Sequence, residues 1–260
     1  MRLGKCQSAK VTLMDFISKN LIWFMVYSFM GWIYESTLRS ITHKRLYNSD
    51  FLNGPYIPIY GCGALLDIHL LNGLKDPLII FLLAGVINCV LEYFTSWAME
   101  KLFHARWWDY SNKPLNLNGR IYYLGFLAFG AFATLVVLYF HPWLVAHTTD
   151  RMSYNLINGL AVLIVVIIAV DTYITVSNME DFKEKYTALV ASLGEAKSEL
   201  SMKLEDLPYA DTIAKLRESF NFQERRLLDA FPHLRFENAR YTAQQIKAMV
   251  IEHTKQLFRS

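Results

Sequence analysis

Four polar residues recur at intervals of four within one long apolar run: Asn88, Glu92, Ser96 and Glu100. Because four residues make slightly more than one helical turn, this spacing predicts a polar stripe along one face of a helix. Glu92 lies near the middle of the run, where an ionised carboxylate facing lipid costs roughly 3 kcal/mol. Its side chain must therefore face protein or water, or be protonated. Such a carboxyl group could bind a substrate or act as a general base, or it could simply pair with an arginine.

Two further apolar runs carry polar residues on one predicted helical face. In the first, Glu35 and Arg39 are four residues apart and can form an ion pair, next to Gly31, which allows another helix to approach closely. The alternative is a helix contact in which Arg39 extends to the membrane surface. In the last run, Asp171 is the only charge, and it marks either a functional site or an interhelical hydrogen bond near the cytoplasmic end.

The segment 103–120, FHARWWDYSNKPLNLNGR, connects the Glu92 run to the next apolar run. Its adjacent Trp107 and Trp108 suit a chain lying in the headgroup layer, which would also be true of an ordinary loop. Four polar residues beside them favour a structured re-entrant loop instead: Arg106, Asp109, Asn118 and Arg120. The charged members could form one network with Glu92 and Glu100, and Asn118 could cap the following helix.

These residues must be positioned by membrane helices. The chain of 260 residues is 53% hydrophobic and only 19% charged, whereas soluble domains have about 25% charged residues. The sequence predicts an all-α fold, a polytopic membrane helical bundle of four to five spans with a cytoplasmic helical tail. Four apolar runs have the roughly 20 residues that a bilayer requires: Leu21–Leu38, Pro77–Met99, Ile121–Leu144 and Leu156–Ser177.

The fifth apolar segment, 51–73, is interrupted by prolines and glycines in its first half. Since proline removes a backbone donor and clashes with the preceding turn, we expect no straight helix through Pro55–Gly63. Irregular backbone at membrane depth persists only where it is buried in protein or lines a wet cavity. We therefore expect a broken or re-entrant segment leading into a short helix, Ala64–Asn72. An ordinary kinked span is the alternative.

The predicted domains are a polar N-terminal segment, 1–20, a transmembrane domain, 21–178, and a cytoplasmic helical tail, 179–260. Lysines and arginines in the 101–120 loop place that loop and the tail in the cytoplasm, but they do not decide the side of the N-terminus. In the tail we expect a helical hairpin or a partner-binding arm. Its helices are predicted at Met179–Leu204, Asp211–Ala230 and Asn238–Phe258.

Several classes of function find no support in the sequence. The net charge of +3 and the balanced charges of the tail argue against nucleic acid as a partner. The three cysteines lack metal-binding spacing, so that neither a metal site nor a cofactor is expected. No GxxxxGK[ST] motif is present, so any ATP hydrolysis would need another chain.

Four strings resemble one family of bacterial integral membrane proteins, the ABC transporter permeases of type IV (CmpB-like): YSFMGWIYES, FLNGPYIPIYGCGALL, LEYFTSWAMEKLFHARWWDYSNKPLNLNGR and FHPWL. The similarity extends over roughly residues 20–178, and QERRLLDAFPHLR in the tail is similar to some members. The resemblance implies a membrane subunit whose ATPase is a separate chain. Five or so spans are few for a permease, which implies a homodimer. The resemblance supplies no substrate and no site residues.

Three hypotheses follow. The first is a permease-like subunit in the bacterial plasma membrane, with the lipid bilayer around it and segment 51–63 as a gate. Its polar pocket would draw on ten residues: Glu35, Arg39, Asn88, Glu92, Glu100, Arg106, Asp109, Asn118, Arg120 and Asp171. The second is an intramembrane enzyme acting on a lipid or phosphorylated headgroup, with Glu92 or Glu100 as general base and Arg106 and Arg120 holding the anion. The third is a scaffold that signals through its tail.

Overall fold

The computed structural model describes residues 2–44, 48–199, 220–237, 239–246 and 248. Its helices are α1 (Arg2–His43), α2 (Pro58–Leu70), α3 (Pro77–Phe103), α4 (Tyr123–Leu135), α5 (His141–His147), α6 (Tyr154–Ser177), α7 (Met179–Glu199) and α9 (Phe222–Ala230). A π-helical turn, η1 (Val136–Phe140), joins α4 to α5. The strands β1 (Ala105–Arg106) and β2 (Arg235–Phe236) form an antiparallel pair. The predicted helical class is confirmed, with this small ladder in addition.

Three helical stretches in the described part of the chain are long and apolar enough to cross a membrane: Pro77–Phe103, Tyr123–His147 and Tyr154–Ala191. They include three of the four predicted spans, except that Ile121 and Tyr122 lie outside the second stretch. The fourth, Leu21–Leu38, is helical but is not among the three, because serine, glycine, tyrosine and Glu35 dilute its apolar character. It belongs to the continuous helix α1, so the predicted boundary after residue 20 coincides with no helix end.

The stretch Tyr123–His147 contains the π-helical turn η1, where the helix is locally wider. Pro142 is the second residue after this turn and has no backbone N–H, and in a regular α-helix its ring would clash with the carbonyl four residues earlier. A π-turn moves that carbonyl away. The helix therefore continues through Pro142 to His147.

Helix α2 begins earlier than expected. The prediction that the chain would be irregular up to Gly63, with a helix at Ala64–Asn72, was wrong, because α2 runs from Pro58 to Leu70. A proline in the first helical turn costs nothing, since that N–H has no intrahelical partner. The irregular part ends at Ile57, whose N–H donates to the Ser28 carbonyl (2.9 Å).

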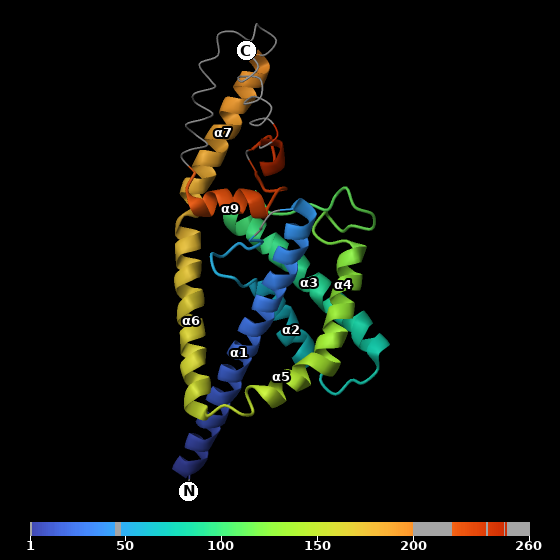
Figure 1. The fold of residues 1–260 in the computed structure, drawn as a ribbon, viewed down its shortest axis with the longest axis vertical. Coiled ribbons are helices and arrows are strands. Elements are labelled where there is room, and N and C mark those ends of the chain that lie inside the picture. The colour runs from blue at the N-terminus through green and yellow to red at the C-terminus, as the bar shows by residue number, and fades with distance from the viewer. Residues whose placement is uncertain (1, 45–47, 200–219, 238, 247, 249–260) are drawn as a thin grey trace.

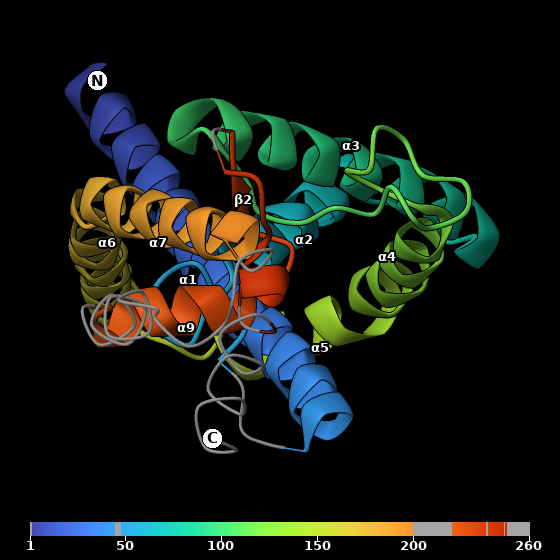
Figure 2. The same ribbon diagram turned by 90° about the horizontal axis from the view of Figure 1, so that it is seen from above.

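The helices form a bundle with a separate cap of tail elements at one end (Figure 1). Seen from above, α2 lies between α1 and α3, with α6 and α4 on opposite sides (Figure 2). Helix α4 packs against α3, and α6 packs against α1. Helices α7 and α9 lie at the same end of the long axis as the loop between α3 and α4, and the N-terminal end of α1 lies at the opposite end.

The helices of the tail match the predicted bounds only in part. Helix α7 follows the predicted start at Met179, but a continuous helix over 211–230 was wrong: α9 begins at Phe222, after a capping box formed by Asn221 and Glu224. Residues 200–219, which include the start of that predicted helix, lie outside the described residues. Most of the predicted Asn238–Phe258 helix also lies outside the described residues. Its predicted start was wrong, because residues 239–242 are not helical, whereas residues 243–246 and 248 are.

Candidate functional site

The polar stripe of α3 exists as predicted, on a helix whose two ends are well defined. Asp76 caps the start by accepting the N–H groups of Leu78 (2.8 Å) and Ile79 (3.1 Å). His104 ends the helix in the left-handed region, at φ 52°, and so turns the chain into β1. The stripe therefore runs from the middle of the bundle towards the tail end of the molecule.

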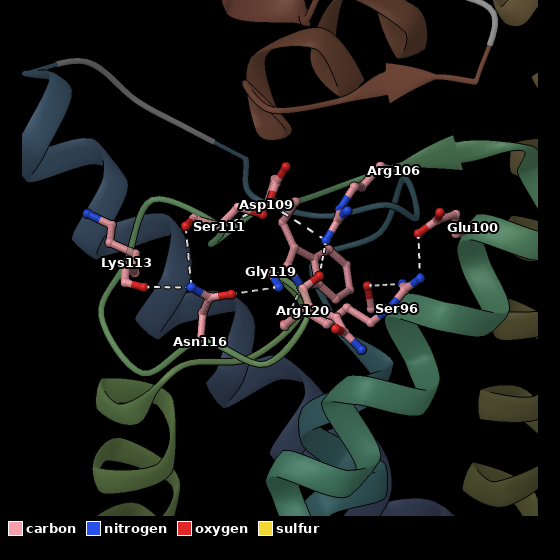
Figure 3. Close-up of polar contacts among 11 residues, drawn as sticks. Ser96, Glu100, Arg106, Asp109, Ser111, Lys113, Asn116, Gly119 and Arg120 are labelled. Carbon is pink, nitrogen blue, oxygen red and sulfur yellow. Dashed lines mark hydrogen bonds and ion pairs between the residues drawn. The ribbon is translucent and has the colours of Figure 1, made fainter.

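Arg120 closes the tail end of this stripe from the neighbouring loop. Its Nη1 donates to the Ser96 hydroxyl (2.9 Å) and its Nη2 forms an ion pair with the Glu100 carboxylate (2.7 Å), as Figure 3 shows. The guanidinium also lies 5.7 Å from the ring centre of Tyr93. Arg120 therefore neutralises Glu100 within the protein. In this part of the predicted network, the Arg120 contacts attach the loop to α3.

The loop itself, residues 104–122, is ordered by its own side chains. Arg106 donates to the Asn118 carbonyl, while Asn116 accepts the Gly119 N–H (2.9 Å) and donates to the Lys113 carbonyl (2.8 Å). Figure 3 shows these contacts beside the end of α3. The loop is therefore structured, although Figure 1 shows it at the end of the bundle and not dipping between the helices.

Asn118 has a different role from the predicted helix cap. Helix α4 begins at Tyr123, after Tyr122, whereas Asn118 lies in a tight turn at φ 53°, next to Gly119 at φ 66°. Asparagine and glycine tolerate this left-handed region better than other residues. The Asn118 amide donates to the Tyr93 hydroxyl (2.9 Å) and so attaches the turn to α3.

Asp109 stabilises the start of the same loop. Its Oδ1 accepts the N–H (2.9 Å) and hydroxyl (2.5 Å) of Ser111 and lies 3.6 Å from the Arg106 guanidinium. Burial opposes ionisation of this carboxyl, but the Ser111 hydrogen bonds and the Arg106 charge outweigh it and lower its pKa. Asp109 is therefore an ionised structural residue of the loop.

Glu35 and Glu92, predicted on separate helices, face a common region. The Glu35 carboxylate accepts the Tyr60 hydroxyl (2.8 Å) and lies 3.6 Å from the Arg39 Nε. The Glu92 Oε2 is buried and has no hydrogen-bond partner among the described residues. Burial and the charges of Glu92 and Glu35 raise the pKa of the loop residue Tyr110, so its phenol is within electrostatic range of both acids.

Helix α2 delivers Tyr60 to this region by packing closely on α1. A Cβ atom at Gly61 would lie 2.3 Å from the Ser28 Oγ and 2.6 Å from the Phe24 carbonyl oxygen. A Cβ atom at Gly31 would lie 2.3 Å from the Tyr60 ring. Both glycines are therefore required by the approach of the two helices, as expected for Gly31.

Asp171 does not join the two glutamates. Its carboxylate accepts the N–H of Asn53 (3.0 Å), the amide of the same residue (2.9 Å), the N–H of Gly54 (2.8 Å) and the hydroxyl of Tyr56 (2.7 Å). These donors come from the irregular segment before α2, which has no secondary structure of its own to satisfy them. Asp171 thus attaches segment 48–57 to α6. Of the two predicted roles, this is closer to the structural hydrogen bond than to a functional site, although the partners lie in an irregular segment and not on a helix.

Asp67 of α2 is a buried acid that was not among the predicted site residues. It is 2% exposed, and its Oδ2 accepts the amide of Asn88 (2.7 Å), the first residue of the α3 stripe. Its Oδ1 has no partner among the described residues. A sequence signal for this residue exists: Asp67 is the only charged residue between Arg45 and Lys75 apart from Asp50, and it lies in an apolar segment.

The tail and the loop share one hydrophobic core, which we call the tail–loop core. It combines Ala105 and Trp107 with buried residues of the tail, including Phe182, Tyr186, Leu227, Leu234 and Phe236. The β1–β2 pair joins the two segments, and the Glu237 N–H donates to the His104 carbonyl (2.9 Å). Trp107 was predicted to lie in the headgroup layer, but it is 3% exposed and lies in this core.

The tail also contacts the membrane bundle through two arginines. Arg39 of α1 donates to the Ala230 carbonyl at the end of α9. Arg226 of α9 donates to the carbonyls of Asp50 and Phe51 (3.0 Å for Phe51), at the start of the irregular segment. The predicted residue Arg39 therefore connects the Glu35 side chain to the tail.

Residues 22–176 match a family described as "Putative ABC-transporter type IV", and the matched segment is more than half of the chain. The chain belongs to this family. The resemblance predicted from the four sequence strings is thus confirmed, and with the apolar helices it identifies a membrane protein related to transporters. No curated protein and no solved structure matches the chain.

The matched region of this type IV ABC-transporter family includes nearly all of the polar contacts described above. It begins within α1 and ends within α6, so that all ten predicted site residues fall inside it, whereas α7, α9 and β2 fall outside. Most of the tail–loop core therefore comes from a segment that the family match does not cover.

Proposed function

We propose that the chain is the permease-like membrane subunit of a transporter in the bacterial plasma membrane, working with an ATPase on a separate chain. Loop 104–122 and the tail lie in the cytoplasm in this proposal. The observation that supports this proposal is the pair Glu35 and Glu92, two acids on separate helices that face one region. The Glu92 Oε2 has no hydrogen-bond partner there among the described residues.

The broken segment beside these acids supports a role in transport. Helix α2 has 13 residues and is about 20 Å long, too short to cross a hydrocarbon core of about 30 Å. Segment 48–57 precedes it with irregular backbone, held by Asp171 and by Ser28. Transporters commonly build their sites where discontinuous helices meet buried charges at membrane depth. In our proposal segment 48–57 and α2 together make one broken crossing, which gives five in all.

The tail–loop core supplies a route by which a cytoplasmic partner could act on the acids. Trp107 lies in that core, and three residues later Tyr110 lies near Glu35 and Glu92. Arg39 connects Glu35 to the end of α9. A change in the tail would therefore reach both acids through short stretches of the described chain.

The test is purification of the full chain from its native host in mild detergent, followed by identification of the proteins that accompany it. We expect a chain that contains a GxxxxGK[ST] motif, whose ATP turnover in nanodiscs rises in the presence of the wild-type subunit. Glu92→Gln keeps the size of the side chain but removes its charge. It should reduce that stimulation by about tenfold, within the usual range for coupling between sites.

The matched control is Glu180→Gln, the same change at an exposed tail position, which should leave the stimulation unchanged. The proposal is wrong if no ATP-hydrolysing chain accompanies the protein, or if Glu92→Gln stimulates as well as the wild type. It is also wrong if Glu92→Gln fails to fold, since Glu92 would then be a structural residue. A change in membrane lipid composition on gene deletion, restored by wild type and not by Glu92→Gln, would instead support an enzyme.

A further inference from the structure

We propose that Asp67 is a proton-binding site, and that its carboxyl carries a proton in the conformation described here. This goes beyond the function proposed above; only the final step, in which the proton accompanies transport, rests on it. The geometry that carries the inference is the position of one acid, almost completely buried between three helical elements, with one oxygen bonded to an amide and the other unpartnered.

The surroundings of Asp67 offer no compensation for a negative charge. Helix α2 packs against α1, α3 and η1. The polar neighbour of the carboxyl is the Asn88 amide, and no charged group in the described part of the chain acts on it. Adjacent positions are apolar: Ile68 is 9% exposed and Leu71 is 2% exposed. A single neutral hydrogen bond does not replace the hydration of an ion, so an ionised carboxylate there would be very costly.

The titratable groups of the packed elements do not supply a positive charge either. On α1, the Tyr27 hydroxyl is engaged with the His141 Nδ1 (2.9 Å). On η1, Tyr139 is 66% exposed and so lies mostly away from the interior. On α3, Glu92 follows Asn88 by four residues, about 6 Å along the helix, and it is itself an acid. A proton is therefore the simplest charge that makes this carboxyl neutral.

The position of Asp67 also provides a route by which the proton can reach water. It lies four residues before Leu71, about 6 Å along the helix from the exposed connection 72–76. Towards the tail, Asn88 continues into the α3 stripe that contains Glu92. When α2 separates from α3, the Asp67 O–H bond would break, the proton would pass to water, and the carboxylate would be hydrated. Return of the proton would allow α2 to close again.

The experiment is infrared difference spectroscopy of the full wild-type chain in nanodiscs, titrated from about pH 5 to about pH 9, where buried carboxyls lose their protons. We expect a carboxylic-acid C=O band that shifts in D₂O and disappears as a one-proton titration. The band should be missing in Asp67→Asn, which keeps the Asn88 contact without an acid. It should remain in Glu92→Gln and in Asp109→Asn.

Four results would overturn the proposal. The band could be absent at all pH values, which means that Asp67 is ionised. It could be present but unchanged across the titration, which means that the proton is structural and never exchanged. It could be lost on addition of sodium chloride at constant pH, which means that a metal cation is the ligand. If the band disappears in Glu92→Gln and persists in Asp67→Asn, the proton belongs to Glu92 and the proposal is equally wrong.

A second measurement covers the case in which Asp67→Asn does not fold. An apolar carbodiimide adds to a protonated carboxyl, transferring the acid proton to a carbodiimide nitrogen while the carboxyl oxygen bonds to its carbon. In the wild-type chain, mass spectrometry should find this adduct on the peptide containing Asp67, with a yield that falls as pH rises. An unmodified Asp67 at low pH would contradict the proposal. Neither measurement requires the ATPase partner, so their failure is distinguishable from failure of the proposed function.

Discussion

In the membrane bundle the helices meet through glycines and buried hydrogen bonds, whereas the tail and loop 104–122 meet through a core of aromatic side chains. Between 11% and 17% of the residues in the three most apolar windows are buried within the protein. By contrast, Phe182, Tyr186 and Phe236 of the tail are at most 1% exposed. Most residues of these apolar windows therefore face outward, whereas the large apolar residues of the tail face inward.

This difference follows from the two solvents. Lipid tails are as apolar as leucine, so helices in a bilayer gain little by burying apolar side chains against one another, and close packing and hydrogen bonds decide how they associate. In water, the burial of apolar area is itself the main stabilising contribution. We therefore expect substitutions in the two regions to act by different mechanisms and with different magnitudes.

The largest effect is expected for Trp107→Ala in the tail–loop core. Loss of a buried tryptophan with edge-to-face contacts to Phe51 and Phe231 should cost about 3–5 kcal/mol in the stability of that unit. Hydrogen exchange in nanodiscs should show faster exchange in α9 and β2, with little change in α4. The control is Trp97→Ala, at a position 48% exposed on α3, which should leave α9 and β2 unchanged. Equal effects of the two substitutions would contradict the comparison.

An intermediate effect is expected for Asp171→Ala in the bundle. The peptide N–H groups of Asn53 and Gly54 would lose their acceptor, at a cost of about 2–3 kcal/mol. Thermal unfolding in detergent should report the loss, and exchange should increase at residues 50–57. Asp150→Ala removes an acid whose side chain is 58% exposed, and its effect should be within about 0.5 kcal/mol of zero. A stable Asp171→Ala variant would show that segment 48–57 is held by other contacts.

The smallest of the three effects is expected for Gly61→Ala. The added methyl group would meet Ser28 and the Phe24 carbonyl, so that α1 and α2 must separate slightly, at a cost of about 1–2 kcal/mol. At Gly159 of α6 the same substitution meets no atom within 4 Å, and should stabilise the helix by up to about 1 kcal/mol. Opposite signs in thermal unfolding are the expected outcome. If both substitutions stabilise, close packing does not decide the position of α2.

Much of the fold was predictable because long apolar runs in lipid have few alternatives to helices. The α3 stripe, the Glu35–Arg39 pair and the Arg120–Glu100 contact all followed from spacing and charge. Two of the predictions that failed show why the rest could not be predicted. Pro58 begins a helix instead of excluding one, and the glycines at 61 and 63 serve packing inside it. Trp107 was assigned to the membrane surface because sequence gives no sign that the tail folds back over the loop.

By itself, the sequence determined that the chain is helical and apolar, that it belongs to a membrane family, and that certain helices carry acids which lipid would not accept. Only the tertiary structure decided which acids meet. Glu35 and Glu92 both act electrostatically on Tyr110. Asp171 accepts hydrogen bonds from the backbone of segment 48–57, and Asp67 accepts one from Asn88. The reason is physical: periodicity fixes the face of a helix on which a side chain lies, whereas its partner depends on the position and rotation of the neighbouring helix, which contacts distant in sequence determine.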